Sequence, residues 1–206
     1  MKVSSGWFSR SAAWLGAVCC LLAIVGFSAA LDGYRHDLHP LGLLGAYGIP
    51  HAWAFNLLGF VLPGVLLTIT AVAVRSRLPV SAGRSAGIGV WLLALSALAF
   101  AAQGLWPLDL RELDGPQGQG HATAWTLWWI AFVPGALSLA VGLSRVPAWR
   151  MLAMSMAVCA MAVLLLAALP PLLLPGPIAQ RIAVVAWLLA YVAVSSGRGK
   201  SAQGGV

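Results

Sequence analysis

Six long apolar stretches separated by short polar segments dominate the pattern of hydrophobic and polar positions along the chain. They cover residues 12–31, 52–74, 85–105, 122–143, 151–169 and 178–194. A membrane-spanning helix needs about 20 predominantly apolar residues, and each stretch is close to that length. The pattern therefore predicts an all-α integral membrane protein with six transmembrane helices, arranged as a bundle of up-down hairpins in one domain over residues 1–206.

Composition supports this interpretation. Of the 206 residues, 61% are hydrophobic and 8% are charged, whereas soluble domains carry about 25% charged residues. All three cysteines fall within apolar stretches and no CxxC pair occurs, so we expect buried packing residues rather than zinc ligands.

Prolines and glycines mark where the helices bend, approach one another or stop. Pro63 and Pro134 are predicted to kink the second and fourth helices, because proline removes a donor and clashes with the preceding turn. A cluster formed by Pro170-Pro171, Pro175 and Pro177 predicts a tight hairpin between the last two helices. Close helix approach is expected at four glycines, namely Gly59, Gly64, Gly135 and Gly142.

The first stretch has a second interpretation. Lys2 and Arg10 precede it, and it ends in Phe27-Ser28-Ala29-Ala30, which resembles a signal-peptidase site. The apolar run is long for a signal peptide, so we favour a retained helix over a cleaved one.

Basic residues predict the orientation. Nine of the twelve fall on one side of the predicted membrane (Lys2, Arg10, Arg75, Arg77, Arg84, Arg145, Arg150, Arg198 and Lys200), and only Arg35, Arg111 and Arg181 on the other. Positive loops stay cytoplasmic, so both termini are expected in the cytoplasm of a bacterial cell, with the protein in the inner membrane. This topology accounts for the net charge of +7 without a nucleic-acid partner.

The same partition gathers the polar chemistry on the predicted outer side. It holds all five acids (Asp32, Asp37, Asp109, Glu112 and Asp114) and all four histidines (His36, His39, His51 and His121). They lie in or beside two loops, at residues 32–51 and 106–121. Any binding or chemistry is therefore expected at the outer face.

A short sequence motif occurs at the end of both loops. His51-Ala52-Trp53-Ala54-Phe55 recurs seventy positions later as His121-Ala122-Thr123-Ala124-Trp125, and a Pro-Gly pair follows each histidine by 12 or 13 residues. The repeat predicts an internal duplication of a helical hairpin. Membrane proteins with such repeats often place a binding site where the repeats meet.

His51, His121 and Asp109 are the main candidates for acid-base catalysis or metal ligation. Imidazole and carboxylate groups suit a divalent ion such as zinc, and histidine titrates near neutral pH. His36, Asp37 and His39 form a second candidate metal group. The structural alternatives are that the two helix-entry histidines anchor at the interface, that the loop histidines are solvated, and that Asp109 belongs to a turn.

Polar side chains within the outer half of the membrane are the candidate ligand-binding residues. Asn56 and Gln103 are the strongly polar groups there, and Tyr34 lies in the first loop. Such amides usually hydrogen-bond across helices, although Asn56 could also line a pocket with His51.

These residues also carry a resemblance to a known family. The chain resembles the bacterial six-helix membrane proteins of the domain of unknown function 998 family at Gly33-Tyr34, Leu43-Leu44-Gly45, Asn56 with Gly59-Phe60, Trp106-Pro107-Leu108-Asp109 and His121. It departs from the family where Leu41-Gly42 replaces a usual serine and where Leu110 replaces a proline. The resemblance implies the six-helix topology and no activity.

Three functional hypotheses follow. The favoured one is a non-enzymatic membrane protein whose outer His/Asp pocket binds a small ligand, lipid headgroup or metal, for transport or sensing. The alternatives are a metal-dependent hydrolase or transferase acting on lipid, and a scaffold subunit of a membrane complex. The first is favoured because no intact catalytic motif is present and no acid lies at mid-membrane depth.

Overall fold

Six helices long and apolar enough to cross a membrane form the computed structural model, which describes residues 5–168 and 174–197. The long helices are α1 (Ser5–Ala30), α3 (Leu62–Arg75), α4 (Gly83–Gln103), α5 (Pro116–Ser144), α6 (Arg150–Ala168) and α7 (Gly176–Ser196). Short α2 (Ala52–Phe55) and π-helical η2 (Asn56–Val61) continue into α3 as one span. Three 3₁₀ turns complete the described elements: η1 (Leu41–Gly45), η3 (Val80–Ala82) and η4 (Pro147–Trp149). The predicted all-helical, six-span fold is confirmed.

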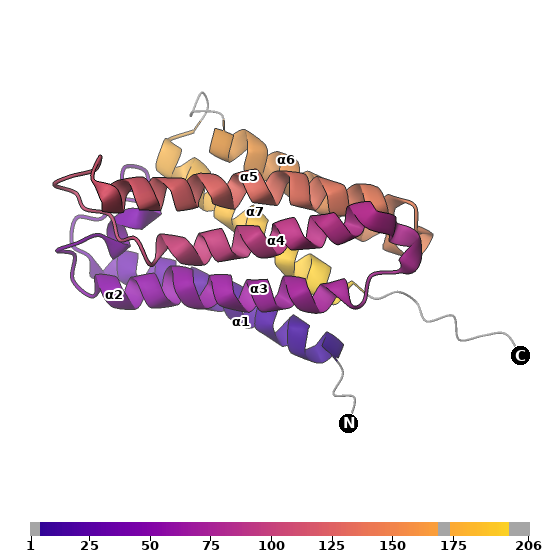
Figure 1. Cartoon of the computed structure of the whole chain (residues 1–206). Coiled ribbons are helices and arrows are strands. Elements are labelled where there is room, and N and C mark those ends of the chain that lie inside the picture. Colours follow the sequence, from indigo (N-terminus) through magenta and orange to yellow (C-terminus); the bar gives the residue numbers. More distant parts are fainter. Residues whose placement is uncertain (1–4, 169–173, 198–206) are drawn as a thin grey trace, which may run out of the picture.

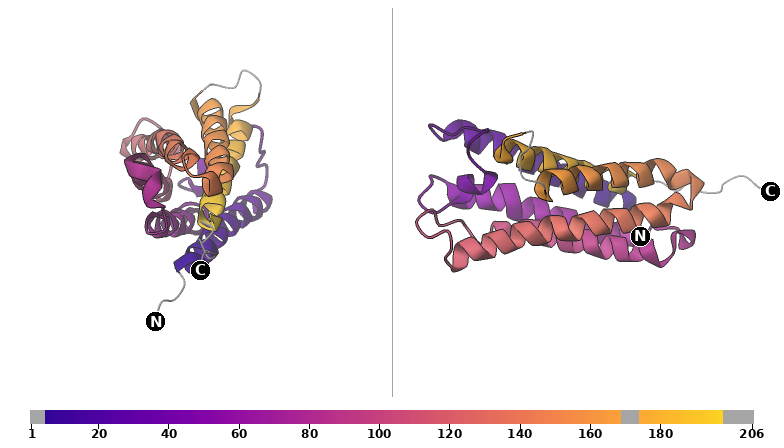
Figure 2. Two further views of the ribbon diagram at one scale, coloured as in Figure 1. Left: turned by 90° about the vertical axis from the view of Figure 1, so that its right-hand side faces the viewer. Right: turned by 90° about the horizontal axis from the view of Figure 1, so that it is seen from above.

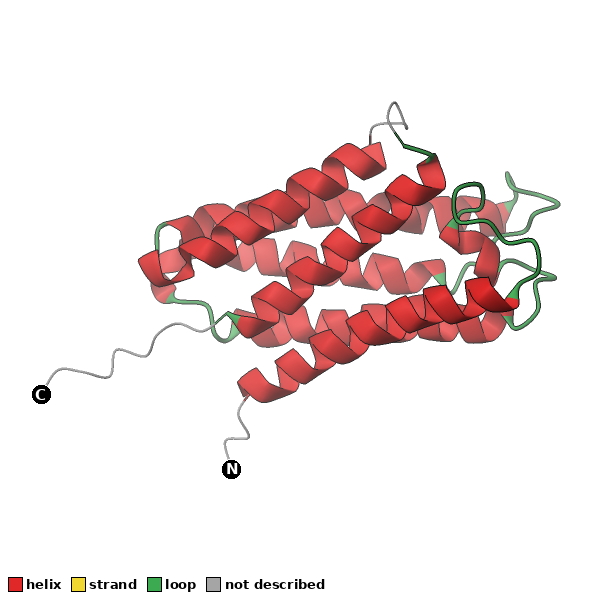
Figure 3. Cartoon of the chain, turned by 180° about the vertical axis from the view of Figure 1, so that it is seen from behind, coloured by secondary structure: helices red, strands yellow, loops and turns green. Residues whose placement is uncertain are grey.

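The helices lie side by side along one axis, so the bundle has two distinct ends (Figures 1 and 2). At the loop end lie loop one (residues 31–51) and loop two (residues 104–115), whereas α1 begins and α7 ends at the opposite, terminal end (Figure 3). All five acids lie at the loop end, while six described arginines lie at the terminal end: Arg10, Arg75, Arg77, Arg84, Arg145 and Arg150. Which end faces the cytoplasm stays a prediction. Lys2, Arg198 and Lys200 lie outside the described residues, as do Pro170 and Pro171 of the predicted hairpin.

Small residues let the long helices pack closely, as predicted for three of the four glycines. A Cβ on Gly64 would lie 2.6 Å from backbone atoms of Ala97 and Ala101 in α4, and one on Gly142 would lie 2.6 Å from the Ala82 oxygen. Gly135 faces Gly89 across the α4–α5 interface. Because lipid tails are as apolar as the helices, this close van der Waals contact supplies much of the packing energy. Gly59 differs, since its nearest neighbour is the ring of Phe55 within its own span.

Ser96, Trp187 and Tyr191 make hydrogen bonds at the centre of the bundle. The Ser96 hydroxyl donates to the Trp128 carbonyl (2.8 Å) and accepts from the Trp187 indole N–H (3.1 Å). The Tyr191 hydroxyl donates to the Leu93 carbonyl. Hydrocarbon offers no alternative partner, so such hydrogen bonds hold α4, α5 and α7 in a fixed register.

The predicted bend at Pro63 takes the form of a π-helix. The Leu62 N–H donates to the Leu57 carbonyl in the i→i+5 pattern, and the corresponding partner of the Leu58 carbonyl would be Pro63, which has no N–H. The Cys19 thiol of α1 donates to that carbonyl instead, at 3.3 Å. Pro134, by contrast, lies inside a continuous α5.

One predicted boundary is wrong. The sequence places His121 at the entry of its helix, whereas α5 begins five residues earlier, at Pro116. Proline suits the first helical turn because its φ angle is already helical and its missing N–H is not needed there. Gly118 and Gly120 stay in the helix since loop two folds back onto them, against the Leu113 carbonyl and the Trp106 ring.

Candidate functional site at the loop end

Loop one folds inward and caps the loop end of the bundle. Its 3₁₀ turn η1 is buried, with Leu41 and Leu44 each 1% exposed. The N–H of Tyr47 donates to the Leu108 carbonyl at 2.8 Å, which joins loop one to loop two. The glycine and apolar residues of η1 after Pro40 are therefore buried in the bundle and do not form a solvated loop.

Two polar residues near the start of α7, Gln180 and Arg181, hydrogen-bond to loop one, and we call this set of contacts the clasp. Arg181 donates from Nε to His36 Nδ1 (3.0 Å) and from Nη2 to the Tyr34 hydroxyl and the His39 carbonyl (3.1 Å). The Gln180 side-chain oxygen accepts from the N–H of Leu41 at 2.9 Å. The sequence suggests only that Arg181 reaches the membrane surface. Arg181 is the one charged residue of its apolar stretch, which contains no acid, and this is the signal in the sequence that hints at its role.

Tyr34 is thus a structural part of the clasp. Burial raises the pKa of its phenol, against the opposing effects of the Arg181 charge and hydrogen bond. The protonated hydroxyl donates to the Pro40 carbonyl at 3.1 Å while it accepts from Arg181. Tyr34 therefore fixes the path of loop one between Leu31 and η1.

We expect an Arg181→Gln substitution to release loop one and to destabilise the folded state by about 2 kcal/mol, because hydrogen bonds to charged groups contribute about 1.5–3 kcal/mol each and this side chain is partly exposed. Trypsin should then cleave after Arg35, which lies in the clasped segment, faster than in the unmodified protein. Arg111→Gln, which changes an exposed arginine of loop two, is the matched control. Equal cleavage rates at Arg35 in all three proteins would contradict the clasp.

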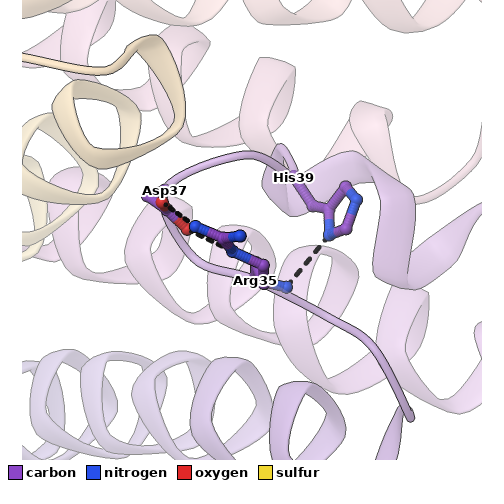
Figure 4. Close-up of polar contacts among 3 residues, drawn as sticks. All are labelled: Arg35, Asp37 and His39. Carbon is purple, nitrogen blue, oxygen red and sulfur yellow. Dashed lines mark hydrogen bonds and ion pairs between the residues drawn. The ribbon is translucent and has the colours of Figure 1, made fainter.

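In the predicted metal group, Asp37 and His39 contact Arg35 (Figure 4), and His36 contacts Arg181. Asp37 pairs with the Arg35 guanidinium at 2.7 Å, and His39 Nδ1 accepts from the Arg35 N–H at 3.0 Å. The hydrogen bond from Arg35 lowers the pKa of the Asp37 carboxyl. Within the described ranges, no three His, Cys, Asp or Glu side chains gather in a way that could hold a metal ion.

His121 is the best-positioned histidine. It is 8% exposed, and its Nδ1 lies 3.0 Å from the Trp106 carbonyl and 3.2 Å from the Gln103 carbonyl. Because carbonyl oxygens only accept, Nδ1 carries the hydrogen, and in the neutral ring Nε2 holds a lone pair. Nε2 faces Gly42 of η1, where a Cβ would lie 2.9 Å away. The imidazole is therefore oriented like that of a base or a ligand-binding group.

The two predicted ligand-binding amides, Asn56 and Gln103, differ in their partners. Asn56 donates to the Gly45 carbonyl at 2.9 Å, so it fastens the second span to η1. Gln103 is 1% exposed, and neither its side-chain oxygen nor its nitrogen has a hydrogen-bond partner among the described residues. A buried amide without partners costs free energy, so Gln103 is a polar group whose burial the described contacts do not explain.

His51 and Asp109 lie apart from this arrangement. His51 is exposed, adopts a left-handed backbone conformation (φ 58°) before α2, and lines a groove along α1. The Asp109 carboxylate accepts from the N–H of Arg111 at 2.9 Å, as in an Asx turn. No contact that the structure describes joins His51, Asp109 and His121. The two copies of the sequence motif therefore have different surroundings.

These features define a multi-pass membrane protein with a capped, polar loop end. The family described as "Protein of unknown function (DUF998)" matches residues 14–197, and the chain belongs to that family. No curated protein and no solved structure matches the chain. The family description carries no activity.

Proposed function

We propose that this membrane protein binds a small polar ligand or a lipid headgroup at its loop end, beneath loop one, in a transport or sensing role. The observation that carries the proposal is the Gln103 side-chain amide, which is buried without a hydrogen-bond partner among the described residues for either polar atom. The backbone carbonyl of the same residue lies 3.2 Å from His121 Nδ1. Native structures rarely bury polar groups without partners, and each exception calls for a ligand, a water or a functional reason. The positive-inside rule supports a loop end that faces outward.

The available groups indicate an uncharged ligand that carries hydroxyl or amide groups. Gln103 offers one acceptor and two donor hydrogens, and His121 offers the Nε2 lone pair as a second acceptor. Asp109, the acid predicted to act with His121, accepts instead from the N–H of Arg111 in its own loop. A sugar, glycerol or amide group could satisfy both side chains without a charge being buried.

The test compares Gln103→Leu and His121→Phe with Thr126→Val, an exposed position on α5 that serves as the control. Each protein is extracted from membranes in a mild detergent and analysed by native mass spectrometry for retained small molecules. The expected result is a retained species in the unmodified protein and the control that is lost in both site variants. The proposal fails if every preparation is free of such a species and Gln103→Leu is more stable by about 1–3 kcal/mol, the cost of a merely unsatisfied amide.

A second candidate function is lipid binding at His51. A groove of about 400 Å³ runs along α1 and the second span, lined by Leu22, Gly26, Phe27, Leu58 and His51. An acyl chain fits such an apolar groove, and His51 would then meet the headgroup. His51→Ala should in that case reduce lipid retention while Gln103→Leu leaves it unchanged.

The hydrolase alternative finds less support. Ahead of Leu44-Gly45 the family resemblance leads us to expect a serine, and this chain has Leu41-Gly42 there. Gly42 is the residue that faces His121 Nε2, so no hydroxyl nucleophile stands against the base. Catalysis would need water as the nucleophile.

A further inference from the structure

Two arginines at the terminal end, Arg10 and Arg77, are partly buried and have no ion-pair partner in the part of the chain that the structure describes. Arg10 belongs to the second turn of α1, and Arg77 follows α3. Nε of Arg10, and both Nε and Nη2 of Arg77, are buried without a hydrogen-bond partner among the described residues. Only Nη1 of Arg77 has one, the carbonyl of Ser195 in the last turn of α7, at 3.1 Å.

The two guanidinium groups lie close enough for their charges to interact. Burial, and then the charge of Arg10, lower the pKa of the Arg77 guanidinium. The Thr70 hydroxyl lies 3.3 Å from the Ser9 carbonyl, which fixes the start of α1 against α3 near both arginines. Three elements, α1, the turn after α3 and the end of α7, therefore meet around this pair.

No acidic side chain at this end neutralises the pair within residues 5–168 and 174–197. All five acids of the chain lie at the loop end, on the other side of the bundle. Two like charges held together with unused N–H donors are costly unless an anion joins them. Guanidinium forks match the oxygens of a phosphate group, which can accept from both side chains at once.

We infer that Arg10 and Arg77 form a binding site for a phosphate group at the terminal end. The site is separate from the proposed ligand region at the loop end. It lies where the membrane-spanning helices α1, α3 and α7 begin or end, which is the depth of lipid headgroups. The phosphate could belong to an anionic lipid or be free in solution, and the two sources can be distinguished.

The experiment uses the purified full chain in detergent micelles doped with phosphatidylglycerol or with phosphatidylcholine, and in undoped micelles with inorganic phosphate. Bound lipid is counted by native mass spectrometry and stability is followed by thermal unfolding. Arg10→Gln/Arg77→Gln is compared with Arg84→Gln/Arg145→Gln, which removes two exposed arginines from the same end. Both double variants lose the same net charge.

Phosphatidylglycerol is expected to bind and stabilise the unmodified protein, and phosphatidylcholine is not. Affinity should fall about tenfold or more in the Arg10/Arg77 variant and less than about twofold in the control. Stabilisation by inorganic phosphate alone, lost in the same variant, would identify a free phosphate instead. Equal losses in both variants, or no preference of the unmodified protein for phosphatidylglycerol over phosphatidylcholine together with no effect of phosphate, would overturn the inference. The second comparison needs no variant, so it holds even if the Arg10/Arg77 protein does not fold.

Discussion

Valine at position 89 is expected to separate α4 from α5 and to leave little folded protein. A Cβ on Gly89 would lie 2.6 Å from the Gly135 oxygen and 2.6 Å from the Leu139 nitrogen. Both are backbone atoms, so the clash is relieved only if one helix moves away from the other. Forcing extra atoms into a packed interior typically costs about 1–3 kcal/mol, and a shift of whole helices raises this to about 4 kcal/mol or more.

Gly87→Val provides the matched control for this prediction. It adds the same side chain two residues away on α4, where the nearest atoms are the flexible guanidinium of Arg75 at 3.7 Å. The measurement is the yield of monodisperse protein and its resistance to unfolding by dodecyl sulfate. If Gly89→Val and Gly87→Val unfold at the same denaturant level, helix packing at Gly89 is not what holds this interface.

Hydropathy and charge position were sufficient to predict the six spans and the separation of acids from most arginines. These signals are averaged over a whole segment, so an irregularity at a single residue does not change them. Detail at single residues was harder to predict. Pro63 marks the place of an irregularity, but whether a kink or a π-helix forms depends on the donor that meets the freed carbonyl, here Cys19 on another helix.

The candidate site was only partly predictable for a related reason. The residues His121, Gln103 and Asn56 stand out by polarity and depth, yet the roles of Asn56 and Arg181 depend on contacts with loop one. The pair Arg181 and His39 is separated by 142 positions, and no local pattern encodes such a contact. Likewise, the sequence motif shared by His51 and His121 does not predict that loop one covers His121 and leaves His51 exposed.

Alanine at position 45 is expected to displace η1 from the bundle and to cost about 3 kcal/mol. A Cβ there would overlap the side-chain oxygen of Asn56, which is buried at 6% exposure. Moving Asn56 aside breaks its 2.9 Å hydrogen bond to the Gly45 carbonyl and leaves a buried amide and a carbonyl without partners. Each unsatisfied group costs about 1–3 kcal/mol. Loop one should then lift away from His121, so that trypsin reaches Arg35 sooner.

A double-mutant cycle with Asn56→Ala distinguishes this mechanism from a general effect of alanine in the turn. Asn56→Ala alone should cost about 1–2 kcal/mol, since it leaves only the Gly45 carbonyl unpaired. In the double variant the overlapping side chain is absent, so Gly45→Ala should add little further destabilisation. The two changes are therefore expected to be non-additive by about 3 kcal/mol, since nearly the whole cost of Gly45→Ala disappears when the Asn56 side chain is absent. Additive losses in dodecyl sulfate unfolding would mean that the Asn56–Gly45 contact does not hold η1, and the closed cap over Gln103 and His121 would lose its support.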